Sequence, residues 1–204
     1  MKTKRRVRHW RQAMVMMALF SMRGPAASAQ NAPVVPPKED TRNAEGFKEL
    51  LDRVHAYVAL HKKVNASLPA LKPTPLPEMI AAHQQALARK IREARSTAEG
   101  GDIFTARAKE AFRRVVRDEF AGPHGHGART TIRQGDPLKE VHLRANQPYP
   151  DGVPFTTVPP TLLLKFPRLP DEVAYRIVGR DLILLDVEAN LVIDCVVGIF
   201  PLAD

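Results

Sequence analysis

The sequence predicts an α+β fold, in which an N-terminal helical region precedes a small C-terminal antiparallel sheet. Apolar residues between positions 44 and 122 recur mostly at intervals of three and four, which is typical of amphipathic helices. After position 171, runs rich in Val, Ile and Leu are separated by Gly and Asn, which is typical of antiparallel strands joined by tight turns. A sheet with an apolar face needs a cover, so we expect the helices to pack on it.

The helical region, residues 44–122, is expected to form a three-helix antiparallel bundle. Four prolines in the first connector separate the first helix from the second, because proline cannot continue a helix. Pro77 suits the first position of the second helix, and Gly101 suits the end of that helix. The third helix is expected to end at Gly122. Short connectors favour antiparallel neighbours around a shared apolar seam.

Residues 123–170 are expected to form a Pro-rich extended segment that wraps over another part of the molecule. Nine of the 18 prolines of the chain lie there, and much of the segment is typical of turns. Three short pieces have the composition of strands: residues 129–133, 141–144 and 161–166.

The last region, residues 171–204, is expected to form a three-strand β-meander that packs on the helices. Gly179 and Asn190 lie between its apolar runs and are the expected turn residues. Cys195, the single cysteine, falls in the third run, so no internal disulfide can form. We expect this thiol to serve as a small hydrophobic side chain of the core.

The first 29 residues have the three parts of a secretory signal peptide. A basic start is followed by the short apolar run 13–20 and by the small-residue cleavage site Ala27-Ser28-Ala29. We expect cleavage between Ala29 and Gln30, and a disordered leader over residues 30–43. The apolar run is about half of the roughly 20 residues that a spanning helix needs, which disfavours a retained transmembrane anchor. The mature chain is therefore expected in the periplasm or outside the cell.

The signal peptide also accounts for most of the positive charge. Residues 1–29 carry seven of the 31 Lys and Arg and none of the 22 Asp and Glu, so cleavage lowers the net charge from +9 to +2. A nucleic-acid-binding protein needs basic residues on its folded domain. The charge balance therefore argues against nucleic acid as a partner.

The sequence contains no motif typical of a catalytic site. The expected mature chain has two serines, Ser67 and Ser96, and neither lies in a G-x-S-x-G turn. No glycine-rich phosphate loop, C-x-x-C or H-E-x-x-H motif occurs. We therefore expect no catalytic residues and no cofactor. The leading hypothesis is a non-catalytic binding or structural protein of the cell envelope, whose partner or ligand and oligomeric state stay open.

Two histidines are weak candidates for metal ligands. His61 lies on the apolar stripe of the first predicted helix and His83 on that of the second, and the two imidazoles would meet in an antiparallel hairpin. Zinc takes four ligands, or three and a water, and the only further donors we identify are in His124-Gly125-His126. The favoured alternative is that both imidazoles lie at the solvent-exposed end of the bundle, hydrogen-bonded to each other or to the backbone. A periplasmic metal-binding accessory protein is thus the first alternative function.

A group of carboxylates lies near the C-terminus. Asp186 and Glu188 are two residues apart, a spacing that puts side chains on one face of a strand. Paired carboxylates can do acid–base chemistry or bind a cation, although acids beside a turn are more often solvated or cap the turn. A carboxylate-dependent hydrolase that uses Asp186 is the second alternative function.

Three stretches resemble a group of exported bacterial proteins with no assigned activity. They are the C-terminal run 175–194, the helical stretch 56–61 and the Pro-rich stretch 156–164. This resemblance implies bacterial export. The C-terminal hairpin is also distantly similar to that of periplasmic nickel- and cobalt-homeostasis proteins, which implies metal handling but identifies no ligand residue.

Overall fold

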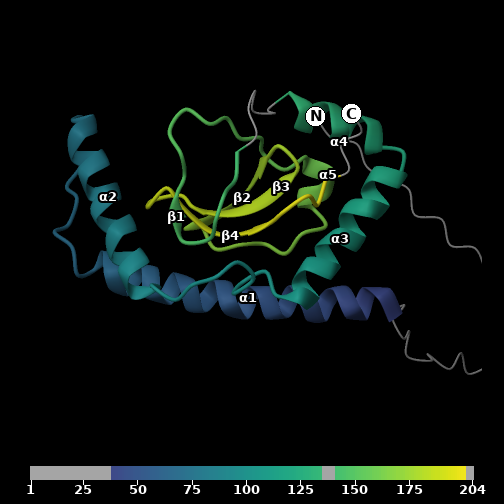
Figure 1. Ribbon diagram of the computed structural model, residues 1–204, viewed down its shortest axis with the longest axis horizontal. Coiled ribbons are helices and arrows are strands. Elements are labelled where there is room, and N and C mark those ends of the chain that lie inside the picture. The colour runs from purple at the N-terminus through teal and green to yellow at the C-terminus, as the bar shows by residue number, and fades with distance from the viewer. Residues whose placement is uncertain (1–37, 135–140, 201–204) are drawn as a thin grey trace, which may run out of the picture. The chain divides into compact units, whose positions relative to one another are not determined.

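The computed structural model describes residues 38–134 and 141–200, which form helices followed by an antiparallel sheet (Figure 1). The helices are α1 (Lys38–Asn65), α2 (Pro77–Ala94), α3 (Ala106–Ala121), α4 (Gly125–Arg133) and α5 (Pro160–Leu163). The strands are β1 (Gln147–Pro148), β2 (Val173–Val178), β3 (Asp181–Asp186) and β4 (Leu191–Val196). The predicted α+β class is confirmed.

The sheet has the strand order β1-β4-β3-β2, and every neighbouring pair is antiparallel. β2, β3 and β4 form the predicted meander, and the short β1 adds to its β4 edge. Gly179 and Asn190 have φ angles of 57° and 49° at the two tight turns. Glycine adopts this left-handed backbone without strain, and asparagine adopts it more readily than most residues. These two residues therefore support the register of the meander.

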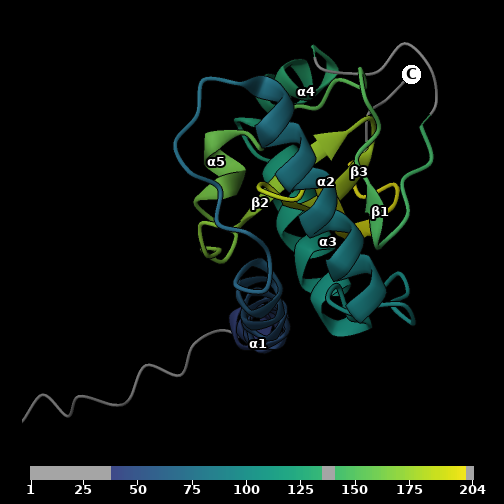
Figure 2. The ribbon, with the colours of Figure 1, turned by 90° about the vertical axis from the view of Figure 1, so that its left-hand side faces the viewer.

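One large apolar core joins the helices to one face of the sheet. Leu182 and Leu184 of β3 are fully buried in it with Leu50 of α1. α1 also lies close against α3, because a Cβ atom on Gly46 would be 2.8 Å from the carbonyl oxygen of Arg107. α2 and α3 rise from α1 on either side of the sheet (Figure 1), and α1 is seen end-on in Figure 2. The three helices therefore share their apolar seam with the sheet and do not close a bundle of their own.

The opposite face of the sheet carries a second, smaller cluster. Ile183 and Leu185 of β3 alternate with the residues that face the helices, and they pack with Val192 of β4. Leu143 and Tyr149, from the Pro-rich region, cover these side chains. The stretch of residues 141–153 thus lies over the sheet face that the helices leave uncovered, whereas Val158, Leu162 and Phe166 are buried in the core on the helix side.

Within residues 123–170, the three expected strand pieces are wrong. Residues 129–133 belong to helix α4, where Ala128 and Ile132 are buried four residues apart, as a helical period requires. Residues 161–166 contain α5 and the turn after it, and Pro160 suits the first turn of that helix. Residues 141–144 form no strand. The short β1 lies instead in a stretch that the sequence indicates as a turn.

α1 begins at Lys38, so helix replaces the expected disordered leader at residues 38–43. A contact with α3 supports this start, because Arg114 Nε donates to Asn43 Oδ1 at 2.8 Å. The predicted signal peptide and residues 30–37 lie outside the described residues. Among the residues that are described, no helix has both the length and the apolar content to cross a membrane.

Candidate functional site

The centre of the candidate site is Asp186, a fully buried carboxylate at the end of β3. Its Oδ1 atom accepts hydrogen bonds from the backbone N–H groups of Glu188 and Ala189, at 3.1 and 2.8 Å. This is the local turn that aspartate side chains commonly form with residues that follow them. The turn fixes the carboxylate, so that Oδ2 faces α1.

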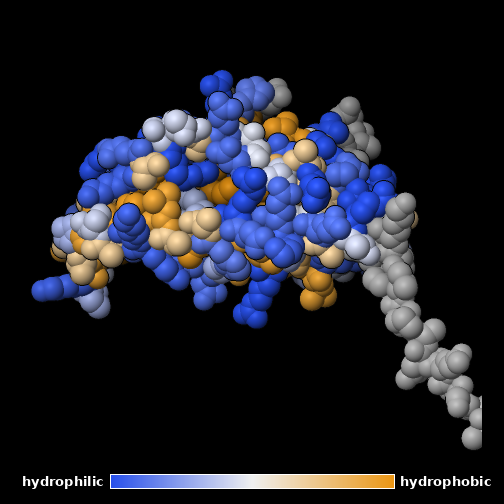
Figure 3. All heavy atoms as spheres, turned by 90° about the horizontal axis from the view of Figure 1, so that it is seen from below, coloured by the Kyte–Doolittle hydropathy of each residue, from blue (hydrophilic) through white to orange (hydrophobic). Residues whose placement is uncertain are grey.

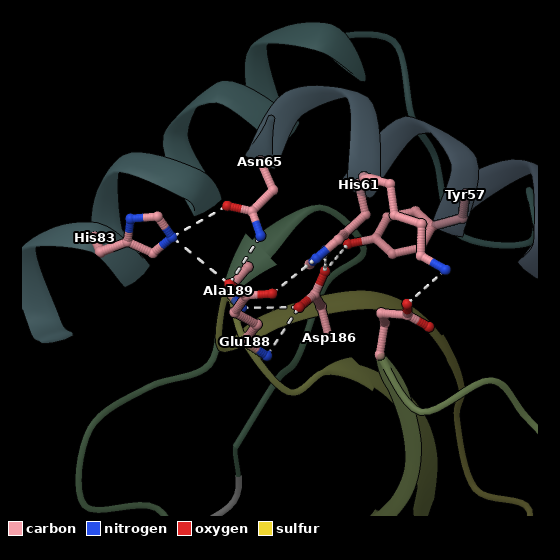
Figure 4. A network of polar contacts seen from close by, with 9 residues as sticks. Tyr57, His61, Asn65, His83, Asp186, Glu188 and Ala189 are labelled. Atoms are coloured by element: carbon pink, nitrogen blue, oxygen red, sulfur yellow. Dashed lines mark hydrogen bonds and ion pairs between the residues drawn. The ribbon is translucent and has the colours of Figure 1, made fainter. Parts of the chain in front are cut away.

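Two side chains of α1 bind that second oxygen. Tyr57 Oη donates to Asp186 Oδ2 at 2.6 Å, and His61 Nδ1 lies 2.7 Å from the same atom (Figure 4). Tyr57 and His61 are four residues apart, which places both on the helix face that is turned to the sheet. Burial and the neighbouring Asp186 charge raise the pKa of Tyr57 well above its ordinary value, so the phenol stays protonated.

His61 lies between two carboxylates and is only 2% exposed. Its Nδ1 faces Asp186, and its Nε2 lies 3.0 Å from Glu188 Oε2. A carboxylate accepts and does not donate, so an imidazolium, with protons on both nitrogens, satisfies both contacts. The hydrogen bond to Asp186 is the main cause that raises the pKa of His61, and Glu188 adds to it against the opposing effect of burial.

Asn65 and His83 extend these contacts toward the surface. Asn65 Nδ2 donates to Glu188 Oε1 at 2.9 Å, and Asn65 Oδ1 lies 3.1 Å from His83 Nε2. His83 Nε2 is also 3.6 Å from Glu188 Oε1. We call the six connected side chains the Asp186 network: Tyr57, His61, Asn65, His83, Asp186 and Glu188. The two candidate histidines therefore belong to one network, but Asn65 and Glu188 connect them and no hydrogen bond joins them directly.

The outer part of this network lines an open pocket of about 510 Å³, the His61 pocket. His61, His83 and Glu188 form a polar wall, and Leu68 and Leu71 from the connector between α1 and α2 form an apolar one. Hydrophobic residues also gather at the α2 end of the surface in Figure 3. Lys62 Nζ and Glu172 Oε1 form an ion pair of 2.9 Å at the pocket. The pocket therefore offers both charged and apolar contacts.

The donor set does not form a ready metal site. Within residues 38–134 and 141–200, no three or more His, Cys, Asp and Glu side chains are grouped so that they could hold a metal ion. His61 Nε2 lies within hydrogen-bond distance of Glu188, at 3.0 Å, and His83 Nε2 lies 3.6 Å from the same carboxylate. His124 and His126 lie at the start of α4 and are not among the residues that line the His61 pocket.

A second buried carboxylate lies on the same face of the sheet. Asp194 of β4 is fully buried, and its oxygens accept backbone N–H groups of the loop before α3, from Gly101, Ile103 and Phe104, at 2.8–3.1 Å. The pairing of β3 with β4 shifts between Leu184 and Leu185. Such an irregularity re-aims side chains. Asp194 anchors the loop and is not part of the Asp186 network.

Cys195 has the properties of a structural thiol. Its Sγ contacts the carbonyl oxygen of Leu143 at 3.8 Å, on the face of the sheet that the Pro-rich region covers. Burial is the main cause that raises the pKa of this thiol to about 11, and Asp194 adds to the shift. A thiol with a raised pKa is a poor nucleophile at neutral pH.

The sequence indicates two separate pairs of candidates, His61 with His83 and Asp186 with Glu188. The structure brings all four side chains into one network. The expectation that Asp186 and Glu188 lie close together is consistent with their shared contact with His61. Tyr57 and Asn65 were missed. The sequence pattern that could have identified them is the i, i+4 spacing of Tyr57, His61 and Asn65, which places three polar side chains in a row on an otherwise apolar helix face.

No protein-family model matches the chain, and neither the curated proteins nor the solved structures contain a match to it. The resemblance to exported bacterial proteins therefore stays a prediction. The function has to be inferred from the geometry of this chain alone.

Proposed function

We propose that this chain is an exported, non-catalytic binding protein of the bacterial cell envelope. The observation that supports a non-catalytic role is the Asp186 network. A general base has to reach a proton of its substrate. Here both nitrogens of His61 and both oxygens of Asp186 bind partners within the protein.

The residues that line the His61 pocket support the same proposal. The ten described lining residues include two His, one Lys and two Glu, but no Ser, Thr or Cys that would act as a nucleophile. A pocket of about 510 Å³ with an apolar and a polar wall suits the binding of a small ligand or of a partner side chain.

The test of the non-catalytic role compares turnover with stability. We expect the purified protein to turn over none of a panel of ester, amide, glycoside and phosphate substrates. We also expect Asp186→Asn to lower the melting temperature measured by circular dichroism. Turnover that Asp186→Asn abolishes without a change in melting temperature would instead favour the carboxylate-dependent hydrolase.

Export rests on the sequence pattern of residues 1–29, and its test is the N-terminus of the protein in the cell. We expect the protein of the envelope fraction to begin at Gln30. Ala29→Leu is expected to block cleavage, because the site requires a small residue there, whereas the matched control Ala32→Leu is expected to be cleaved normally. Native protein that keeps residues 1–29 in the cytosol would contradict the proposal.

Metal binding is the second candidate, favoured by one observation: His61, His83 and Glu188 line the same pocket. A ligand at a hundred times its dissociation constant stabilises the folded state by about 2.7 kcal/mol. Metal binding predicts a rise in melting temperature with Ni²⁺, Co²⁺, Zn²⁺ or Cu²⁺ that His61→Ala with His83→Ala removes. His83→Ala alone separates binding from folding, because His83 lies at the outer end of the network. His55→Ala, an exposed histidine on α1, is the matched control.

A further inference from the structure

Four arginines line one pocket on a different part of the molecule, which we call the arginine pocket. Arg113 and Arg117 come from successive turns of α3, Arg129 comes from α4, and Arg180 comes from the turn between β2 and β3. The pocket has a volume of about 460 Å³. Its other lining residues are Phe120, Ala121, Gly198 and Ile199.

Two of the four guanidinium groups are held in place by the fold. Arg129 Nη2 donates to the carbonyl oxygen of Phe120 at 3.1 Å, and its guanidinium carbon lies 5.1 Å from the centre of the Phe120 ring. Arg180 Nε donates to the carbonyl oxygen of Phe200 at 3.2 Å. A guanidinium has five N–H donors, so each of these contacts leaves several donors for a ligand.

Positive charge exceeds negative charge around the arginine pocket. No Asp or Glu is among the described residues that line it. Arg117 and Asp118 form an ion pair of 3.8 Å between two exposed side chains, a kind of pair that contributes little. Asp181 follows Arg180, and its Oδ1 accepts the N–H group of Gly198 at 2.7 Å. Four like charges around one hollow repel each other, and a bound anion would remove that repulsion.

We propose that the arginine pocket binds a phosphate group, either free or as part of a larger molecule. Guanidinium groups donate two parallel hydrogen bonds to phosphate oxygens, and one phosphate has enough oxygens to engage several arginines at once. The volume lies within the roughly 300–1,000 Å³ of small-molecule sites, which leaves room for the group that carries the phosphate. This inference goes beyond the proposed function, because the arginine pocket shares no described lining residue with the His61 pocket.

The test is a titration of the purified protein with inorganic phosphate and with glycerol 3-phosphate, followed by phosphorus NMR at about 0.1 M salt. We expect saturable binding of both probes. Arg113→Gln and Arg117→Gln are each expected to weaken it roughly tenfold, the effect of losing one charge-assisted hydrogen bond. Arg113 and Arg117 are exposed and hold no described backbone group, so these variants should fold normally. Arg129→Gln and Arg180→Gln follow only after their melting temperatures are known.

Arg107→Gln is the matched control, because it removes the same charge from the same helix outside the pocket, where Arg107 pairs with Glu45 at 3.9 Å. We expect it to leave phosphate binding within about twofold of the native affinity, because Arg107 lies roughly 9 Å along the helix from Arg113 and roughly 15 Å from Arg117. At about 0.1 M salt the Debye length is roughly 10 Å, so most of the effect of its charge is screened. An equal loss of affinity in this control would overturn the proposal, because binding would then depend only on net charge. Absence of saturable binding to the native protein would also overturn it, and would leave the wider binding function standing.

A second arm distinguishes a soluble phosphate from a lipid headgroup. The probe is a set of phosphatidylcholine vesicles with and without phosphatidate. If the protein is retained on the phosphatidate vesicles and the double variant Arg113→Gln with Arg117→Gln is not, the ligand is a lipid headgroup. If the protein binds glycerol 3-phosphate but not these vesicles, the ligand is a soluble phosphate ester. The phosphorus NMR spectra of the glycerol 3-phosphate titration also report any hydrolysis of this ester to free phosphate. Hydrolysis would contradict the non-catalytic function and not the binding of phosphate at this pocket.

Discussion

Asp186 and Asp194 are both fully buried on the side of the sheet that faces the helices, but their partners differ in kind. Asp186 accepts two backbone N–H groups of its own turn, and its other oxygen is bound by two side chains of α1, one of which is an imidazole. Asp194 is bound by backbone N–H groups of the loop before α3 and of Cys195. Backbone groups do not titrate, whereas a histidine does. The first aspartate therefore makes the contact between α1 and the sheet depend on pH, and the second makes a contact that is independent of the charge of its partners.

The largest effect is expected at Asp194. Asp194→Ala leaves several buried backbone N–H groups without acceptors, and we expect it to lower the free energy of unfolding by about 4 kcal/mol. Urea denaturation followed by circular dichroism measures this change. Asp102→Ala is the matched control in the same loop, where the side chain caps an exposed turn and its loss is expected to cost under about 1 kcal/mol. Similar losses at Asp102 and Asp194 would mean that the loop is not anchored as described.

Asp186→Asn is expected to lower the free energy of unfolding by about 3 kcal/mol. The amide of the variant keeps one acceptor oxygen, but its NH₂ group faces either Tyr57 and His61 or the two backbone N–H groups. All of these groups donate their protons to Asp186 in the native protein, so the NH₂ group meets donors instead of acceptors. Denaturation of the variant and of Tyr57→Phe, which removes only one donor, separates the contributions. If Asp186→Asn lowers the free energy of unfolding by no more than Tyr57→Phe does, the charge of the carboxylate contributes little to stability.

The stability that His61 contributes is expected to decrease as the pH rises. The pKa of His61 is raised in the folded protein, so the folded state holds this proton more tightly than the unfolded chain, whose histidine titrates near pH 6.5. The contribution is therefore complete below about pH 6 and is lost as the pH rises through the folded pKa.

We expect the free energy of unfolding of the native protein to exceed that of His61→Gln by about 2 kcal/mol at pH 6. This difference is expected to shrink toward pH 9. Denaturation of both proteins at a series of pH values measures it. A difference that grows with pH would reverse the sign and exclude an imidazolium between the two carboxylates. The Asp194→Ala difference provides the comparison and should stay constant over the same range.

The smallest effect is expected at Glu188. Its side chain is 42% exposed, so solvent screens its contact with His61, and Glu188→Gln should cost under about 1 kcal/mol. The same substitution should lower the pKa of His61, because it removes one of the charges that favour the protonated ring. NMR titration of the His61 ring measures this shift. An unchanged pKa would mean that Asp186 alone sets the charge of His61.

The candidate site was only partly predictable. His61 and His83 were identifiable because polar residues on apolar helix faces are unusual, and Asp186 and Glu188 because their spacing places them together. Their contacts around Asp186 were not predictable, because they join His61 to residues that are 125 and 127 positions away in the chain. The arginine pocket was missed for the same reason. Its four members come from three separate elements, and the low net charge expected of the mature chain hides their clustering.

The sequence by itself determined the α+β class, the helical region and the turns of the meander. Each depends on local properties: the period of apolar residues, the missing N–H group of proline, and the backbone freedom of Gly179 and Asn190. Only the tertiary structure decided that residues 129–133 are helical, that the helices share their core with one face of the sheet, and that His61 lies between two carboxylates. These outcomes depend on which surfaces bury each other and which buried polar groups find partners, and such free energies arise only between segments that are far apart in the chain.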